Sequence, residues 1–322
     1  MPFYRCMPRS SGNNGDHCGH ITINYINEQY EVPLFSNVPI YNMSMGECED
    51  NVTFNCPINI GSAMKSAENL LQYYNNFNSY INMQNADNLR SVANMIYLCN
   101  NYNQPTIFPK NIYNYYTSLR RCRTYNQPTE IFINCPDSAE ANLAGMFMES
   151  SSINSKITIS LQSENSRNCD YTSFLYGASS FNQPLILKGV TGLNFTLNSA
   201  NNMNCPIVVD FSTKYPNLTT GNNTLWGARV DNIIVLNYVN QAIKWDGTLQ
   251  DVTFYVNDPY TFVNRCTRLY RQGVDKYSYI PIENGLQADV MYYNIRVLYN
   301  VSDGLNYFNN VWHSYYNEYP EY

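Results

Sequence analysis

The stretch Phe181-Asn182-Gln183-Pro184-Leu185-Ile186-Leu187 is the most informative in the chain, because its pattern recurs along the sequence. A large apolar residue precedes an asparagine, Gln-Pro or Cys-Pro often follows, and a short run of β-prone residues comes next. The repeat asparagines are Asn55, Asn78, Asn103, Asn126, Asn154, Asn182 and Asn204. Successive asparagines are 23, 25, 23, 28, 28 and 22 residues apart. A pattern that recurs at such an interval predicts a stack of similar structural units.

Two further columns extend the repeat beyond the motif itself. The residue immediately before the asparagine is apolar in every copy: Phe54, Phe77, Tyr102, Tyr125, Ile153, Phe181 and Met203. The residue five positions after the asparagine is apolar as well: Ile60, Met83, Phe108, Ile131, Ile159, Leu187 and Val209. Intervals of about 20–29 residues are typical of leucine-rich-repeat solenoids. We therefore expect an α+β repeat solenoid of that type, with capping segments at both ends.

Each part of the repeat has an expected structural role. The segment upstream of the asparagine, for example residues 92–98, has helix-like apolar spacing and predicts a short helix or 3-10 turn. The asparagine is expected to bond backbone groups of its own coil and of the next, because buried polar groups need partners. A short strand follows, in which the third and fifth side chains after the asparagine face inward and the fourth faces outward. The repeat asparagines are therefore interpreted as structural residues.

The outward-facing position of the strand forms the candidate binding column. This outward column is Asn59, Asn82, Ile107, Glu130, Thr158, Ile186 and Val208. It is partly apolar, which is more than contact with solvent alone favours, and this is the property of a binding stripe. Two alternatives stay open: a neighbouring chain covers the strands, or the residues reflect β-propensity alone.

The N-terminal segment differs from the repeat region. Residues 1–53 are rich in turn residues, and two β-prone runs at 21–25 and 30–35 predict a hairpin that serves as an arm or cap. The solenoid itself is expected over residues 54–256. Because residues 1–53 lie outside the solenoid, they are the segment that we expect to attach the protein to a larger assembly.

The repeat weakens toward the C-terminus. Runs at 232–236 and 251–256 keep the shape of a strand without the asparagine motif. Residues 257–322 are expected to form a C-terminal cap or interaction module, with a strand over 290–298 and a helix over about 303–316. Atypical terminal segments are common in solenoids, because the last coil would otherwise leave an apolar end open.

Composition excludes some functions and favours others. The net charge is −6, and only 19 of 322 residues are Lys or Arg, whereas binding to nucleic acid depends on clustered basic residues. The chain has 49 Asn and 30 Tyr, which form hydrogen bonds without charge and suit contacts with proteins or glycans. Codon bias in an AT-rich genome is the alternative cause of this enrichment. We therefore expect no nucleic-acid partner.

The sequence also predicts where the protein is made. No apolar segment of a secretory signal peptide is visible at the N-terminus, and no run approaches the ~18–20 apolar residues of a membrane span. Cys99 and Cys122 lie four residues before a repeat asparagine, where other copies have Ala or Ser, and Cys56 and Cys205 share the position after the asparagine. Because free cysteine behaves as a small buried apolar residue, we expect unbridged thiols and synthesis in a reducing cytoplasm.

The sequence gives no catalytic motif. The three histidines, His17, His20 and His313, all lie outside the repeats, so no nucleophile–base–orienter arrangement is indicated. Hydrolysis of a glycan would need two carboxylates at a defined separation. The acids of the repeat region occupy non-equivalent positions: Glu130, Glu149, Asp170 and Asp210. We therefore expect no enzyme and no cofactor, with a polysaccharide-degrading solenoid as the alternative.

One cluster has the residue types of a zinc site. Cys6, His17, Cys18 and His20 lie within fifteen residues, and Cys and His are the usual zinc ligands. Their spacing fits no standard zinc signature. We therefore expect unligated side chains and no metal, and keep these four as the metal candidates.

The motif Ser180-Phe181-Asn182-Gln183-Pro184-Leu185, with Tyr176-Gly177-Ala178 before it, resembles the BspA-like leucine-rich repeats. The segment Gly145-Met146-Phe147-Met148-Glu149-Ser150 resembles the upstream half of that consensus, and the resemblance covers roughly residues 54–211. It implies a solenoid used in adhesion by surface proteins of gut bacteria, protists and their phages. Cellular members normally have export signals or wall anchors.

The resemblance and the expected cytoplasmic synthesis together predict a bacteriophage virion protein: a fibre, capsid-decorating or tail-associated component. Such a protein is assembled with other virion proteins and released by lysis. Binding to a host-surface protein or glycan is a further expected role. The alternatives are a bacterial cell-surface adhesin with leucine-rich repeats and, second, the polysaccharide-degrading enzyme described above.

Overall fold

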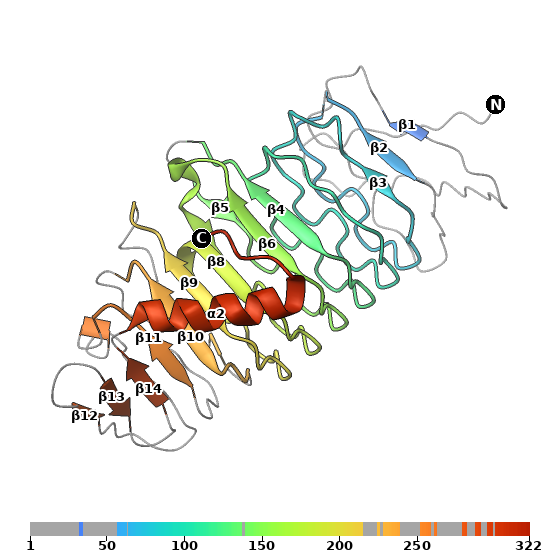
Figure 1. Cartoon of the computed structure of the whole chain (residues 1–322). Helices are drawn as coiled ribbons and strands as arrows, with labels where there is room; N and C mark the ends of the chain where they lie inside the picture. Colours follow the sequence, from blue (N-terminus) through green and yellow to red (C-terminus); the bar gives the residue numbers. More distant parts are fainter. Residues whose placement is uncertain are drawn as a thin grey trace.

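In the computed structural model, the chain winds into a solenoid whose successive coils add parallel strands side by side (Figure 1). The repeat solenoid predicted from the asparagine spacing is therefore confirmed. The structure describes residues 57–62, 64–136, 139–214, 224–225, 228–238, 252–258, 261–262 and 300–322, together with the strand backbones at 32–34, 279–281, 287–290 and 295–298.

The coils consist of short strands joined by turns. The strands are β1 (Val32–Leu34), β2 (Ile58–Ile60), β3 (Ile81–Asn82), β4 (Thr129–Ile133), β5 (Ala141–Asn142), β6 (Ile157–Leu161), β7 (Cys169–Asp170), β8 (Leu185–Gly192), β9 (Ile207–Phe211), β10 (Asn232–Leu236), β11 (Thr253–Tyr255), β12 (Tyr279–Pro281), β13 (Gln287–Val290) and β14 (Ile295–Leu298). Two helices have defined bounds, the 3-10 helix η1 (Glu164–Ser166) and α2 (Val301–Tyr316), and the described residues 261–262 are also helical. The sheet orders are β1-β2-β3, β4-β6 and β12-β13-β14-β11-β10-β9-β8-β7-β5. The pairs β12–β13 and β13–β14 are antiparallel, and the other pairs are parallel.

The strand register follows the sequence repeat. Leu185 and Leu187 of β8 pair with Ile207 and Val209 of β9, so residues at the same distance from a repeat asparagine lie side by side. The residues five positions after the asparagine are all buried, from Ile60 to Val209. Their burial confirms the inward direction predicted for this column. The prediction depended on the fact that alternate side chains of a strand face opposite sides of the sheet.

The apolar column before the asparagine forms a stack through the core. The rings of Phe77 and Tyr102 have centroids 5.7 Å apart and lie 10° from parallel. The rings of Tyr102 and Tyr125 are 5.9 Å apart and 2° from parallel. The buried Tyr102 hydroxyl bonds the Thr106 hydroxyl at 2.7 Å, and Tyr125 bonds Thr129 at 2.8 Å. The coils of Tyr102 and Tyr125 thus bury a large ring and still pair its phenol, as buried tyrosines require.

The repeat asparagines form a hydrogen-bonded ladder between coils. In each step, the backbone N–H of one asparagine donates to the side-chain oxygen of the asparagine one coil earlier, at 2.8–2.9 Å. The steps are Asn103 to Asn78, Asn126 to Asn103, Asn154 to Asn126, Asn182 to Asn154, and Asn204 to Asn182. The bond to the next coil that the repeat predicts is confirmed for these residues. Asn55 lies outside the described residues.

The described segments upstream of the asparagines consist of turns, so of the predicted short helix or 3-10 turn they contain turns and no helix. The N–H groups of Val92, Asn94 and Ile96 donate to carbonyls of the next coil, at 2.8–2.9 Å, while those of Met95 and Tyr97 donate to the carbonyl of the third residue back. A helix would need all of these donors within its own segment. Asn94 (φ 53°) and Leu98 (φ 62°) also have left-handed backbones, and later coils repeat such a pair four positions apart.

A second polar column precedes these turns and was not predicted. Its members are Ser66, Ser91, Asn114, Asn142 and Asp170, which successive parallel pairings bring side by side. The side-chain oxygen of each accepts the N–H two residues later, at 2.9–3.5 Å. Such local bonds are typical of Asx and Ser turns. The column therefore starts the turn segment of these coils in the same way.

The described residues nearest the two ends of the chain join a sheet or lie on its face. β1 belongs to the predicted N-terminal segment and pairs in parallel with β2, so the sheet continues into that segment; the run at 21–25 of the predicted hairpin lies outside the described residues. The strand predicted over 290–298 is divided between β13 and β14. The helix predicted near 303–316 is confirmed as α2, which lies across the outward face of β8, β9 and β10 (Figure 1).

Candidate functional site

α2 covers the C-terminal half of the outward column. Val301, Phe308 and Trp312 form one buried apolar cluster with three outward strand residues. These strand residues come from β8, β9 and β10: Ile186, Val208 and Ile234. This second apolar cluster lies on the opposite face of the sheet from the main core. The solenoid is therefore two-layered at this end.

The sequence of α2 explains why it packs there. Val301, Leu305, Phe308, Trp312 and Tyr316 recur three or four residues apart, which places them on one stripe of a helix. The side chain of Asn300 accepts the Asp303 N–H at 3.2 Å and caps the first turn. A Cβ at Gly304 would lie 2.5 Å from the Tyr255 ring, so a residue without a side chain lets the helix approach β11.

Polar contacts hold the C-terminal end of α2 on the coils. The ammonium group of Lys156 pairs with the Glu318 carboxylate and lies 5.5 Å from the Trp312 ring centre and 4.9 Å from that of Tyr316. The hydroxyl of Tyr316 donates to Gln183 Oε1 at 2.9 Å. The bond to Lys156 lowers the pKa of the Glu318 carboxyl. These contacts join residues that are more than a hundred positions apart.

The outward column is therefore divided, which corrects the single binding stripe predicted from the sequence. Ile186 and Val208 are buried in the cluster beneath α2. Ile107 is 51% exposed and Glu130 is exposed, while Asn82 and Thr158 are partly exposed. The side chain of Asn59 is outside the described residues. The part of the column that is covered lies under the chain's own helix and not, as one alternative proposed, under a neighbouring chain.

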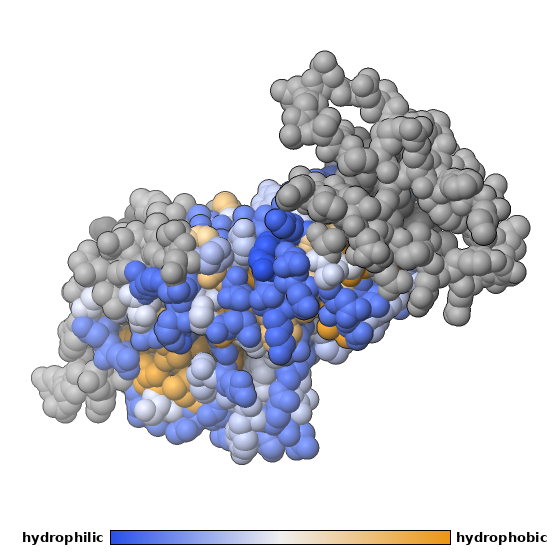
Figure 2. Space-filling model, turned by 90° about the horizontal axis from the view of Figure 1, so that it is seen from above, coloured by the Kyte–Doolittle hydropathy of each residue, from blue (hydrophilic) through white to orange (hydrophobic). Residues whose placement is uncertain are grey.

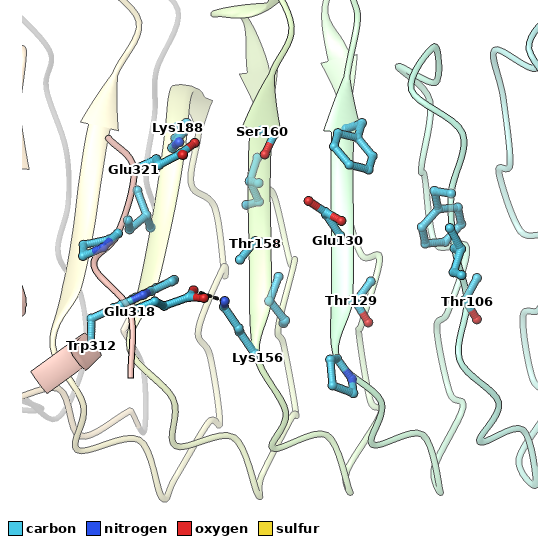
Figure 3. A pocket seen from close by; sticks show the side chains of 18 of the residues that line it. Thr106, Thr129, Glu130, Lys156, Thr158, Ser160, Lys188, Trp312, Glu318 and Glu321 are labelled. Carbon is cyan, nitrogen blue, oxygen red and sulfur yellow. Dashed lines mark hydrogen bonds and ion pairs between the residues drawn. The ribbon is translucent and has the colours of Figure 1, made fainter. Parts of the chain in front are cut away.

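A groove lies where the open part of the column meets the end of α2. This outer groove has a volume of about 690 Å³. Glu130, Thr158 and Ser160 lie on its floor, on β4 and β6, and the tail after α2 forms one wall (Figure 3). Tyr319 and Glu321 belong to that wall. Several coils and a distant segment thus build the groove together.

The residues that line the outer groove include more negative than positive charges. Lys156 is paired with Glu318, and Lys188 lies beside Glu321 (Figure 3). Burial lowers the pKa of Lys188, and the charge of Glu321 partly opposes that shift. The Glu130 carboxylate points from β4 toward β6 (Figure 3), and no described residue bonds it. The groove therefore has one uncompensated negative charge.

The other acids named from the sequence have structural partners. Glu149 pairs with Arg121 of the previous coil. Asp170 accepts bonds from the N–H and hydroxyl of Thr172, at 2.9 and 2.7 Å. The fourth acid, the buried Asp210, accepts a bond from the Arg167 guanidinium at 2.8 Å. Only Glu130 among the four lines the outer groove.

The described cysteines are buried and unbridged. The thiols of Cys99 and Cys122 donate to the carbonyls of Leu71 and Ile96, each in the preceding coil, at 3.0 Å. Burial raises the pKa of the Cys122 thiol. For these two residues the predicted role as small core residues is confirmed.

The described part of the chain has neither a metal cluster nor a membrane-spanning helix. Within these ranges, no group of three or more His, Cys, Asp and Glu side chains could hold a metal ion, and no helix is long and apolar enough to span a bilayer. The zinc candidates Cys6, His17, Cys18 and His20 lie outside the ranges. Figure 2 shows mostly hydrophilic residues on the coloured surface seen from above, with hydrophobic residues gathered over the C-terminal part of the solenoid.

Comparisons with known proteins find none that is similar to this chain. No family model matches the chain, and searches of curated proteins and of solved structures find no match. The sequence motif and the geometry of the outward face are therefore the features that bear on its function.

Proposed function

We propose that this chain is a non-catalytic structural and binding protein of a bacteriophage particle, which contacts the host surface through the open half of its outward column. The open half consists of Asn82, Ile107, Glu130 and Thr158 together with the outer groove. The observation that carries the binding role is the exposure of this half, in contrast to the covered half at Ile186, Val208 and Ile234. Solenoids present such extended faces to their partners.

The repeat motif supports the assignment to an adhesive repeat class. We infer that the solenoid belongs to the BspA-like leucine-rich repeats, because Phe181-Asn182-Gln183-Pro184 resembles their consensus. Each described asparagine of the motif bonds a neighbouring coil, which gives the motif a structural reason to recur. Phage members of that class are the basis for proposing a virion location.

Labelling of particles tests the proposal directly. Antibodies against the recombinant chain, conjugated to gold, should label purified virions in electron micrographs, and the protein should appear in the mass spectrum of such virions. Excess recombinant protein should also reduce adsorption of the phage to host cells. Labelling of cell envelopes and not of particles would favour the bacterial adhesin instead.

A polysaccharide-degrading activity is the second candidate, and one observation favours it. Glu130, Glu318 and Glu321 all line the outer groove, and glycoside hydrolysis uses a pair of carboxyl groups. We expect no release of reducing ends when the protein is incubated with host-surface polysaccharide. Release that disappears in Glu130→Gln would replace the proposed binding role with catalysis.

A further inference from the structure

We propose that the outer groove binds a neutral glycan chain across β4, β6 and β8, with Tyr319 and Glu130 as its main contacts. This inference rests on the proposed use of the open half for binding and specifies the ligand. It concerns a groove that the repeat motif alone does not reveal, because one wall comes from the tail after α2.

The shape of the groove suits an extended polar chain. Its volume of about 690 Å³ lies within the range of about 300–1,000 Å³ found for ligand sites. The floor crosses neighbouring strands, and Glu130 on β4 pairs in register with Thr158 on β6. Side chains are therefore presented at the strand spacing of about 4.7–4.9 Å. A chain molecule with regularly repeated hydroxyl groups matches such a floor.

Tyr319 provides a flat surface at the wall of the groove. It is 67% exposed, and its ring stacks on the His313 ring at 4.8 Å with an angle of 9°. One face of the ring is thus held by α2 while much of the residue remains accessible. Tyrosine gives a rigid contact surface at low cost in conformational entropy. The C–H face of a sugar ring can pack against such a surface.

The floor provides hydrogen-bonding groups that no described residue occupies. The carboxylate of Glu130 and the hydroxyls of Thr158 and Ser160 line the groove without a bond to another described side chain. A carboxylate accepts hydrogen bonds, and hydroxyls both donate and accept. The hydroxyl groups of a sugar can satisfy all three. An apolar ligand would leave these groups unpaired, which is unfavourable.

The charge of the groove selects against acidic ligands. Lys156 is neutralised by Glu318, and Lys188 lies beside Glu321 (Figure 3). Glu130 then adds a negative charge that an acidic glycan would have to approach, and like charges disfavour binding. The overall charge of −6 acts in the same direction. A neutral glycan avoids this repulsion and still bonds the carboxylate.

Calorimetric titration of the full chain tests the inference. The probes are maltohexaose, cellohexaose, mannohexaose and chitohexaose, with oligogalacturonate of equal length as the acidic comparison. At least one neutral hexaose should bind, and oligogalacturonate should not. Tyr319→Ala should weaken binding about tenfold, while Tyr116→Ala, at another exposed tyrosine that lies outside the groove, should not. Glu130→Lys should weaken the neutral ligand and admit the acidic one.

Three results would overturn the inference. They are no binding of any neutral hexaose, equal affinity of Tyr319→Ala and Tyr116→Ala, or binding of oligogalacturonate to the unaltered chain. In a separate assay, the recombinant chain is added to host cells. Loss of its binding after protease treatment of the cells would assign the surface a protein partner instead of a glycan. Glycan binding by a chain that is absent from virions would contradict only the particle assignment. Virion labelling without glycan binding would contradict only this inference.

Discussion

Ile107 and Ile186 occupy the same position of the repeat, yet one is 51% exposed and the other is 6% exposed. Both follow a repeat asparagine by four residues and face away from the main core. The difference is that Ile186 lies beneath α2, whereas Ile107 lies in a segment that forms no strand and is not covered by α2. Side chains at the same position of the repeat therefore face the same side of the coil but differ in what covers them.

The two halves of the outward column also differ in chemistry. The covered half has Ile186 and Val208, which together with Ile234 of β10 match the apolar stripe of α2. The open half includes Glu130 and Thr158, which can contact water or a polar ligand. Lys156 lies at the boundary and binds the tail by its pair with Glu318. The solenoid thus keeps one half of the face for its own helix, and α2 leaves the other half uncovered.

Removal of the helix should make the largest difference between the halves. A chain that ends at residue 299 would expose Ile186, Val208 and Ile234 together, and an apolar patch of this kind promotes association. We expect self-association in sedimentation velocity and increased binding of a hydrophobic dye. A chain that ends at Asn317 keeps α2 and should sediment as the full chain does. Identical behaviour of all three chains would contradict the covering role of α2.

Replacement of Ile186 and of Ile107 by alanine compares the two halves directly. Ile186→Ala removes buried methyl groups and should lower the free energy of unfolding by about 2–4 kcal/mol. Ile107→Ala makes the same chemical change at an exposed site and should have an effect within about 0.5 kcal/mol. Chemical denaturation measures both. Equal losses would show that the two positions do not differ as described.

The asparagine ladder is common to both halves and should show a smaller effect. Asn154 accepts the Asn182 N–H at 2.8 Å and the Gln183 side-chain amide at 3.1 Å. Asn154→Ala removes these acceptors and should cost about 1 kcal/mol, with faster hydrogen exchange at the Asn182 amide. Asn201→Ala, at an exposed asparagine outside the ladder, is the control. Unchanged exchange at Asn182 would contradict the ladder bond.

The pair at the boundary should contribute least. Glu318 is half exposed, so Glu318→Gln should change stability by less than about 1 kcal/mol, and salt should reduce the difference. Because Lys156 lowers the carboxyl pKa from its ordinary value of 4.5, the contribution is present above that value and is lost as the pH falls through the lowered pKa. Thermal unfolding of both proteins at neutral and acidic pH measures this. A difference that persists in acid would rule out the ion pair as its cause.

Local features of the coil were predictable where the signal is periodic. The inward column ending at Val209 and the ladder ending at Asn204 follow from alternation and spacing, and both are seen. The helix upstream of the asparagine was predicted wrongly because apolar spacing does not reveal that alternate N–H groups bond the next coil. That bonding depends on a neighbour more than twenty residues away, so no local propensity contains it.

The second polar column, which was not predicted, has a signal in the sequence. Ser66, Ser91, Asn114, Asn142 and Asp170 each lie twelve residues before a repeat asparagine. The turn segment is therefore constant in length, and the variation of the repeat lies between the strand and this column. Alignment on the turn as well as on the asparagine would have found it.

The main features of the coil follow from the sequence alone: where the inward side chains lie along the repeat and which asparagines join neighbouring coils. They do so because these features repeat at short range and depend on alternation and hydrogen-bond demand. Which outward residues remain free, and where the outer groove lies, became visible only in three dimensions. Those features depend on contacts such as Lys156 with Glu318, 162 residues apart, which follow from the packing of an apolar helix stripe onto an apolar sheet face.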